Sequence, residues 1–378
     1  MPGSAGNQDG IARPNGLGFT IDFHGPVAFE DEVEFLAQFV VVPFGRLTDR
    51  DGGLSEGVVL YGGIGAIQDA ADGTSVLRGE VILLGKLVDR HVGTGIVPTS
   101  QRKASPRMKF PTQDCTAIIT GASSGLGAEF ARQLALQARM LVLVARRIES
   151  LEAVKTNLLA IRPDLEVHLV VADLALADGR SVLVDWVKKS GISLNLLINN
   201  AGLGDYGTLA SATQERLQAQ IDVNVTALVL LTHALLPHLQ ANVPAGIINI
   251  SSLAGTIPMP DHAVYSASKA FVTSFSEALA VELQSQHIQV TCVCPGPTPT
   301  NFSMTARRPD GTDTDRSGQR LLRIPSSQVV AEALAGLRDG KVCVFPGRGV
   351  SIAGSLFRLL PRALMRWFLR RRFNKGTL

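Results

Sequence analysis

Short apolar runs alternate with segments of helical length along the chain from residue 115 onward. The runs are rich in Val, Ile and Leu, which is typical of strands that are buried on both faces. They cover residues 116–119, 141–145, 167–171, 194–199, 247–251, 290–294 and 342–345. This order of elements predicts an α/β fold with a doubly wound parallel sheet, a Rossmann-type domain over 113–347.

The pattern differs in residues 1–96, which are rich in glycine. Of the chain's 37 glycines, 18 lie before residue 110. Short β-favouring runs at 39–42, 58–61 and 81–84 are separated by Asp-Gly turn signals. They predict a small β-rich N-terminal unit, and the polar, proline-containing stretch 97–112 reads as a linker. An alternative stays open, in which Met108 is a natural start and the preceding residues form no functional domain.

The last segment, 348–378, combines arginines at four-residue intervals with large apolar side chains. It predicts a basic amphipathic tail with a bend at Pro361. Either the tail lies in an anionic membrane interface, or it packs on its own domain or on a dimer partner. Its members are Phe357, Arg358, Leu360, Arg362, Leu364, Arg366, Trp367, Phe368, Arg370 and Phe373.

Composition and charge narrow the possible partners and compartment. With 46% hydrophobic and 18% charged residues, the 378-residue chain is globular rather than mainly disordered. Eight basic residues and no acid lie from Arg348 onward, so the body carries five net negative charges, which argues against a nucleic-acid-binding face there. Four cysteines without zinc-finger spacing predict neither a disulfide framework nor a metal site, and favour a reducing, cytoplasmic compartment. We find no export signal and no obvious membrane span in the sequence.

A glycine-rich loop, TGASSGLG at 120–127, follows the first predicted strand and opens a helix that runs to about residue 138. Its spacing is Gly-x3-Gly-x-Gly. Glycine lets the backbone approach a pyrophosphate, and the helix N-terminus offers free N–H groups with partial positive charge. The strand before and the helix after favour a dinucleotide site over an ordinary turn.

Arginines follow the second predicted strand, at the place where an acidic residue would bind a ribose 2′-hydroxyl. Arg146 and Arg147 suit a 2′-phosphate instead, so NADP(H) is favoured over NAD(H). Alternatively, both are solvated residues at the start of the next helix. Asp173, after the third strand, is a candidate acceptor for an adenine amino group or a turn-initiating residue.

Tyr265 and Lys269 lie four residues apart in an Ala/Ser-rich helical stretch, so they share one helix face. An ammonium near a phenol favours the phenolate and is expected to lower the tyrosine pKa toward that of a usable general acid and base. Ser252, at a strand end, is placed to donate to a substrate oxygen or to cap the strand.

Together these motifs resemble the short-chain dehydrogenase/reductase family over residues 111–345. The resemblance rests on the TGASSGLG loop, Asp173, Asn199-Asn200-Ala201-Gly202, Asn224, Ser252, the YSASK segment at 265–269, and Cys294-Pro295-Gly296 with Thr298 and Thr300. It implies that Tyr265 protonates the carbonyl oxygen, Lys269 binds the nicotinamide ribose, Ser252 polarises the carbonyl and Asn224 holds a water. It implies cofactor contacts at Gly121, Ser123, Ser124, Gly125, Leu126, Gly127, Arg146, Arg147, Asp173, Asn200, Ala201, Gly202, Tyr265, Lys269, Pro295, Gly296, Thr298 and Thr300.

The sequence thus predicts an NADP(H)-dependent oxidoreductase that interconverts a carbonyl and a secondary alcohol. An apolar lip at 257–259 allows an apolar or lipid-like substrate, or else these residues are ordinary loop packing. Residues 301–320 occupy the family's variable substrate-loop position. Expected partners are this small molecule, a second copy of the chain in a homo-oligomer, and a membrane surface through the tail. The alternative is a regulatory or lipid-binding protein that uses the Rossmann domain as a scaffold.

Overall fold

The computed structural model describes residues 110–306 and 322–374, together with the backbone of six strands between residues 18 and 83. The chain divides into two compact units, Met1–Ser100 and Gln101–Leu378. The predicted linker lies outside the described residues up to position 109, as does the predicted substrate loop from 307 to 320.

The first unit contains an antiparallel sheet in the strand order β1-β6-β5-β2. The β-rich prediction is therefore confirmed, and the Asp72-Gly73 turn signal lies between the two long strands. A separate two-stranded pair is formed by β3 and β4. The bounds are β1 Gly18–Ile21, β2 Val41–Pro43, β3 Leu47–Thr48, β4 Leu54–Ser55, β5 Val58–Gln68 and β6 Ser75–Leu83.

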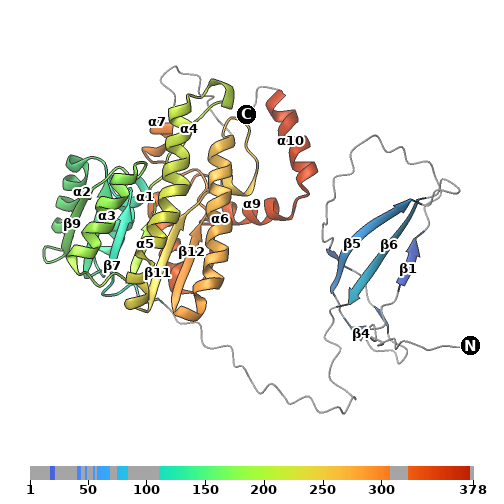
Figure 1. The fold of residues 1–378 in the computed structure, drawn as a ribbon, viewed down its shortest axis with the longest axis horizontal. Helices are drawn as coiled ribbons and strands as arrows, with labels where there is room; N and C mark the ends of the chain where they lie inside the picture. Colours follow the sequence, from blue (N-terminus) through green and yellow to red (C-terminus); the bar gives the residue numbers. More distant parts are fainter. Residues whose placement is uncertain are drawn as a thin grey trace, which may run out of the picture. The chain divides into compact units, whose positions relative to one another are not determined.

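The second unit is built on a seven-stranded parallel sheet in the order β13-β12-β11-β10-β7-β8-β9 (Figure 1). Every predicted strand of this domain is present. Strand order reverses between β7 and β10, which makes their carboxyl ends the topological switch point where such sheets bind ligands. The bounds are β7 Thr116–Thr120, β8 Met140–Ala145, β9 Glu166–Val171, β10 Leu196–Asn199, β11 Ala245–Ile250, β12 Ile288–Val293 and β13 Cys343–Val344.

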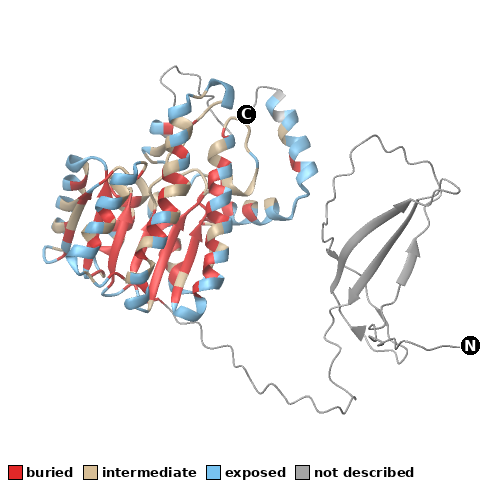
Figure 2. Cartoon of the chain, viewed as in Figure 1, coloured by how far each residue is buried: buried red, intermediate tan, exposed pale blue. Residues whose placement is uncertain are grey.

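Helices cover both faces of this sheet, as the doubly wound prediction requires. One buried cluster packs α1 (Gly125–Leu134), α2 (Ile148–Ile161) and α8 (Ser326–Arg338) on the first face. A second cluster packs α3 (Ala177–Ser190), α5 (Leu228–Ala241) and α6 (Ala263–Leu283) on the other. Neighbouring residues of the central strands alternate between the clusters. The strands β7, β8, β10 and β11 are therefore buried throughout, whereas the edge strand β9 is exposed at both ends. The outer helix faces are exposed (Figure 2).

A buried polar network ties the sheet to the helices of the second face. The Asn199 amide donates to Thr232 Oγ1 on α5 and to Asn249 Oδ1 on β11, each at 2.9 Å. The Asn249 amide donates in turn to Ser276 Oγ on α6 at 2.9 Å. Asn199 Oδ1 itself is buried without a hydrogen-bond partner, so the network is directed by its amide donors. Directed hydrogen bonds of this kind favour one arrangement of the core, here beside the ends of β10 and β11.

The helical run Gln214–Ala241 is long and apolar enough to cross a membrane by length and composition, which the sequence analysis did not anticipate. It comprises α4 (Gln214–Ile221), the π-helical turn η2 (Asp222–Ala227) and α5. Leu231, Leu235 and Leu239 are buried in the core against the sheet. This packing identifies the run as a core helix of the domain.

The tail forms two helices with different environments. α9 (Arg348–Leu359) packs on the domain through Val350 and Gly354, and Arg358 Nη2 donates to Glu277 Oε1 of α6 at 2.6 Å. Pro361 follows the end of α9, which confirms the predicted bend, and α10 (Arg362–Asn374) begins next. The apolar and basic side chains of α10 are largely exposed, so packing on its own domain holds for α9 but not for most of α10, and packing of α10 on a dimer partner stays a prediction.

Candidate active site

The glycine-rich loop after β7 is closely packed against its own backbone. Gly121 and Gly125 have positive φ values of 66° and 57°, which L side chains rarely adopt. A Cβ at Gly127 would collide with the Gly121 carbonyl oxygen and lie 2.6 Å from Asn200 Nδ2. The three glycines are therefore sterically required for the loop as it stands.

The loop fits a dinucleotide at the start of α1. Ser124 is the N-cap but makes no side-chain cap hydrogen bond, and the first turn carries no acid, so the helix N-terminus keeps free donors for a phosphate. Ser123, Ser124 and Leu126 are half-buried along this edge.

The switch point between β7 and β10 is fastened by Thr120 and Asn200. Asn200 Nδ2 donates to the carbonyls of Thr120 at 2.9 Å and Gly121 at 3.2 Å. Thr120 Oγ1 accepts from the backbone N–H groups of Asn200 and Ala201 at 2.9 and 3.0 Å. The sequence analysis placed Asn200 beside the cofactor loop, but it missed Thr120 as the residue that joins the two strand ends.

The predicted adenosine end carries charges of both signs. Arg146 and Arg147 are exposed beyond β8, and Arg146 Nη1 lies 4.0 Å from Asp173 Oδ2 beyond β9. Asp173 Oδ1 also accepts from the Ala175 N–H at 3.0 Å, so its turn-forming role is present. Both guanidinium groups remain accessible for a ligand phosphate.

The segment after β12 approaches the glycine-rich loop. A Cβ at Gly125 would lie 3.2 Å from Thr300 Cβ. Two predicted cofactor contacts that are far apart in the sequence, Gly125 and Thr300, therefore lie next to each other. Pro295 accepts a hydrogen bond from the Leu253 N–H at 2.9 Å, and Thr298 Oγ1 donates to the Gly296 carbonyl at 3.1 Å.

The candidate catalytic residues converge from three elements. Ser252 follows β11 and caps η3 (Leu253–Thr256), and Tyr265 and Lys269 lie in the first two turns of α6, as predicted. Lys269 Nζ lies 5.8 Å from the centre of the Tyr265 ring and donates to the Ile250 carbonyl at 2.9 Å. Ser252 hydrogen bonds with the Tyr265 hydroxyl, and its Oγ also accepts from the Ala254 N–H at 3.1 Å.

Asn224 is buried within η2, where the helix widens to a π-helical turn. Its Oδ1 accepts from the Leu203 N–H at 2.8 Å, and its Nδ2 donates to the Leu203 carbonyl at 2.9 Å and to Ser268 Oγ at 3.0 Å. A Cβ at Gly202 would lie 3.3 Å from Asn224 Oδ1 and 3.4 Å from Lys269 Nζ. Gly202 therefore leaves open the space between these two polar groups.

The pKa directions differ from the expectation drawn from the Tyr–Lys spacing. Burial raises the pKa of Tyr265 to about 12, while the hydrogen bond with Ser252 acts in the opposite direction. Burial lowers the pKa of Lys269 to about 8. The expected lowering of the Tyr265 pKa is thus wrong for the chain alone, because desolvation dominates and the ammonium donates to the Ile250 carbonyl.

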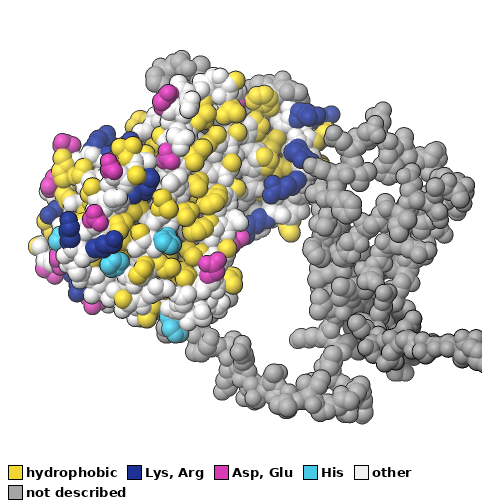
Figure 3. Space-filling model, viewed as in Figure 1, with side chains coloured by type: hydrophobic (Ala, Val, Ile, Leu, Met, Phe, Trp, Pro, Cys, Tyr) yellow, Lys and Arg dark blue, Asp and Glu magenta, His cyan; other side chains and the backbone are white. Residues whose placement is uncertain are grey.

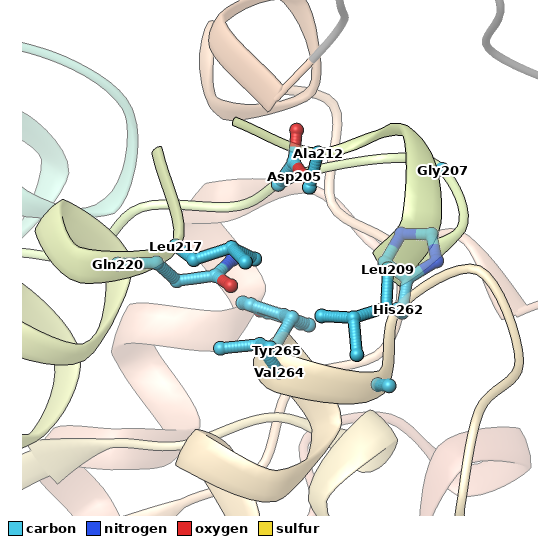
Figure 4. Close-up of a pocket in the computed structure, with 10 residues that line it drawn as sticks. Asp205, Gly207, Leu209, Ala212, Leu217, Gln220, His262, Val264 and Tyr265 are labelled. Atoms are coloured by element: carbon cyan, nitrogen blue, oxygen red, sulfur yellow. The ribbon is translucent and has the colours of Figure 1, made fainter. Parts of the chain in front are cut away.

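A small pocket lies beside Tyr265 and is lined by α4, α6 and the segment between β10 and α4 (Figure 4). Gln220 Oε1 is buried there without a hydrogen-bond partner, a feature that the sequence motifs did not signal. The predicted lip at 257–259 is not part of the lining. The lining residues are Asp205, Gly207, Leu209, Ala212, Leu217, Gln220, His262, Ala263, Val264 and Tyr265.

Comparison with known proteins agrees with this geometry. Residues 115–311 match the family described as short chain dehydrogenase. A sulfoacetaldehyde reductase of Chromohalobacter salexigens is 38% identical over 59% of this chain and 85% of its own. A very-long-chain 3-oxoacyl-CoA reductase of Mycosarcoma maydis is 31% identical over 63% of this chain and 66% of its own. A short-chain dehydrogenase from Sphingobium yanoikuyae, solved with NADPH, is 28% identical with a TM-score of 0.54, covering 66% of this chain and 97% of that one.

The fold and these relatives define a nicotinamide-dependent oxidoreductase, NAD(P) being the cofactor class. The chain belongs to the short-chain dehydrogenase/reductase family.

The lowered pKa of Lys269 predicts how stability without cofactor depends on pH. Unfolded lysine keeps its proton to about pH 10.5, whereas the folded residue releases it near pH 8, so the unfolded state binds more protons between these values. Stability should therefore rise with pH in this interval. We expect the unfolding free energy of wild type, relative to Lys269→Met, to rise by about 2 kcal/mol between about pH 7 and pH 9.5.

Urea unfolding of both proteins at the two pH values measures this difference. Titration of the cysteines occurs in both proteins and cancels. An unchanged difference would show that the folded ammonium is not desolvated.

Proposed function

We propose that this enzyme is an NADPH-dependent reductase that interconverts a ketone or aldehyde and the corresponding alcohol, with an apolar or lipid-like substrate. The observation that carries the proposal is the convergence of Ser252, Tyr265 and Lys269 beside a pocket, next to a loop that fits a dinucleotide.

The bound nicotinamide supplies the hydride for carbonyl reduction. Ser252 and Tyr265 supply hydroxyl donors to the carbonyl oxygen, where negative charge grows during this transfer. A phenol with a pKa of about 12 is fully protonated near neutral pH, so Tyr265 begins as a proton donor. Lys269, buried beside the ring with Asn224 across the space at Gly202, holds the positive charge that stabilises the resulting phenolate.

Tyr265→Phe is expected to lower turnover by about 100-fold to 10,000-fold while NADPH still binds, because only the proton donor is lost. Tyr206→Phe is the matched control, since it also removes one phenol hydroxyl. The Tyr206 ring packs edge-on against His262, with 4.4 Å between the two ring centres. NADPH absorbance measures turnover, and cofactor fluorescence measures binding. Near-wild-type turnover in Tyr265→Phe would exclude the proton-donor role.

NADPH is favoured over NADH by the two exposed guanidinium groups beyond β8. The only described ion-pair partner of Arg146 is Asp173, at the limiting distance of 4.0 Å, so the pair holds Arg146 weakly. A 2′-phosphate accepting from either arginine is worth several times more than this exposed pair.

Replacing Arg146 and Arg147 together by Ala is expected to weaken NADPH binding by about tenfold or more and to leave NADH binding nearly unchanged. Arg338→Ala, an exposed arginine on α8, is the matched control. Fluorescence titration with both cofactors measures the selectivity. Equal affinity of the unmodified enzyme for the two cofactors would refute the assignment.

The pocket supports an apolar substrate because Leu209, Leu217 and Val264 line it near Tyr265. Among the relatives, the very-long-chain 3-oxoacyl-CoA reductase also favours a lipid-like carbonyl compound, whereas the sulfoacetaldehyde reductase favours a small polar one. We base our proposal of a lipid-like compound on these three apolar side chains, which share the lining with the polar residues Asp205, Gln220 and His262.

The surface of α10 supports peripheral contact with an anionic membrane. Leu364, Trp367, Phe368 and Phe373 are between 43% and 52% exposed. Basic side chains gather along the same helix on the second unit (Figure 3), and Arg371 lies 4.2 Å from the centre of the Trp367 ring. Each basic residue near such a surface contributes about 1 kcal/mol, and the aromatic rings add apolar insertion.

A chain truncated after Leu360 keeps α9 and its contacts and should lose binding to phosphatidylserine vesicles. The double variant Trp367→Ser/Phe368→Ser should lose most of it, whereas Leu136→Ser, at an even more exposed apolar site outside the tail, should not. Vesicle sedimentation, with pure phosphatidylcholine as reference and at rising salt, measures the effect. Equal pelleting of full-length and truncated chains would exclude α10 as an anchor.

Two further features support a homo-oligomer in a reducing compartment such as the cytoplasm. Exposed apolar side chains on α4, α5 and α6 offer a surface for a second copy: Ile221, Leu230, Phe271 and Val281. All four cysteines are free thiols.

A further inference from the structure

Three cysteines form a cluster on one face of the sheet, although one of them lies about fifty residues after the other two in the sequence. Cys292 lies in β12, Cys294 directly follows the end of this strand at Val293, and Cys343 on β13 is the register partner of Cys292. Their sulfur atoms all lie within 4.8 Å of one another, with Cys294 Sγ 3.8 Å from Cys292 Sγ and 3.9 Å from Cys343 Sγ. The sequence analysis considered spacing along the chain and therefore missed this cluster.

Cys343 differs from the other two in access and charge. Cys292 and Cys294 are completely buried, whereas Cys343 is partly exposed. Arg358 Nη2 of α9 lies 3.5 Å from Cys343 Sγ, and the same nitrogen donates to Glu277 Oε1 at 2.6 Å. Hydrogen bonds from the Cys292 and Cys294 thiols, and the Arg358 charge, hold the pKa of the Cys343 thiol well below its usual value.

We propose that Cys343 is a peroxide-reactive thiolate that Cys292 resolves to a reversible disulfide. The Cys343 thiolate and one proton react with hydrogen peroxide to give a sulfenic acid and water. The Cys292 thiol then displaces the sulfenic hydroxyl, which leaves as a second water, and the S–S bond forms. Two thiols are oxidised and one peroxide is reduced.

Register favours Cys292 over Cys294 as the resolving residue. Neighbouring strands lie about 4.8 Å apart, so the Cα atoms of Cys292 and Cys343 fall inside the range that a disulfide spans. Cys294 lies two residues further along the chain, which places its Cα about 8 Å from that of Cys343, outside the range. The short distance between the Cys294 and Cys343 sulfur atoms therefore does not suffice for a bond.

The cluster also contacts the catalytic helix. Thr273 Oγ1 lies 3.9 Å from Cys292 Sγ and donates to the Lys269 carbonyl at 3.0 Å. Formation of the disulfide would move the Cys292 sulfur toward Cys343 and break its contact with Thr273. Thr273 lies one helical turn after Lys269 on α6. Oxidation is therefore expected to lower turnover, a consequence that rests on the proposed function.

The test treats the reduced full-length chain with graded hydrogen peroxide and maps cross-linked peptides by mass spectrometry without reduction. We expect a cross-link to the Cys343 peptide in wild type and in Cys294→Ser. In Cys292→Ser we expect no cross-link and a Cys343 sulfenic acid that dimedone traps. Cys115, which is completely buried and lies outside the cluster, is the internal control and should stay unmodified.

Arg358→Gln should slow oxidation of Cys343 by about tenfold, because the thiolate loses its cation. Arg348→Gln, at an exposed position on the same helix, should not. Modification of Cys115 at the same dose, or a cross-link that persists in Cys292→Ser, would overturn the proposal. So would oxidation that begins only after treatment with a metal chelator, which would make the cluster a metal site.

Turnover is followed in the same samples. It should fall as the cross-link forms and return with dithiothreitol. Full cross-linking with unchanged turnover would contradict the proposal that oxidation acts on catalysis through Thr273 and Lys269. The cross-link itself is detected by mass spectrometry and not by activity, so its failure and the failure of the proposed function can be told apart.

Discussion

The hydrogen bonds of Thr120 and Asn200 across the ends of β7 and β10 hold the site in place. They close the gap at which strand order reverses, and they hold the glycine-rich loop against β10. Because the two strand ends are held together, a Cβ at Gly121 or Gly127 would collide with neighbouring backbone or with Asn200. The same strand end leads to Gly202, which lies between Asn224 and Lys269. The glycine-rich loop and the candidate catalytic residues are therefore positioned by the same set of hydrogen bonds.

Desolvation of the candidate catalytic pair accompanies this arrangement, in which Lys269 is buried and Tyr265 is half-buried. It opposes ionisation of both groups, raising the pKa of Tyr265 and lowering that of Lys269. In the mechanism that we propose, negative charge develops on the Tyr265 oxygen and is stabilised by the positive charge of Lys269, which lies on the same helix face. Binding sites with such buried, perturbed groups are typical of enzymes rather than of structural scaffolds.

Much of this was predictable from local pattern. Buried parallel strands are continuous apolar runs, so β7 to β13 were located correctly. The Gly, Ser252 and Tyr265 motifs mark strand ends and a helix start, where the structure brings the candidate site residues near one another. Properties set by packing were not predictable. The pKa of Tyr265 depends on its surroundings, the division of the tail depends on what α9 contacts, and the cysteine cluster depends on the register of β12 with β13.

The central claim is hydride transfer to a carbonyl carbon at Tyr265. The most direct measurement incubates the enzyme with NADPH doubly deuterated at C4 and a panel of ketones and aldehydes of increasing alkyl length, with sulfoacetaldehyde included, and analyses the alcohols by mass spectrometry. The account predicts one deuterium on the former carbonyl carbon, most efficiently with the longer apolar substrates. Enzyme that binds NADPH yet transfers no deuterium to any member of the panel would contradict it.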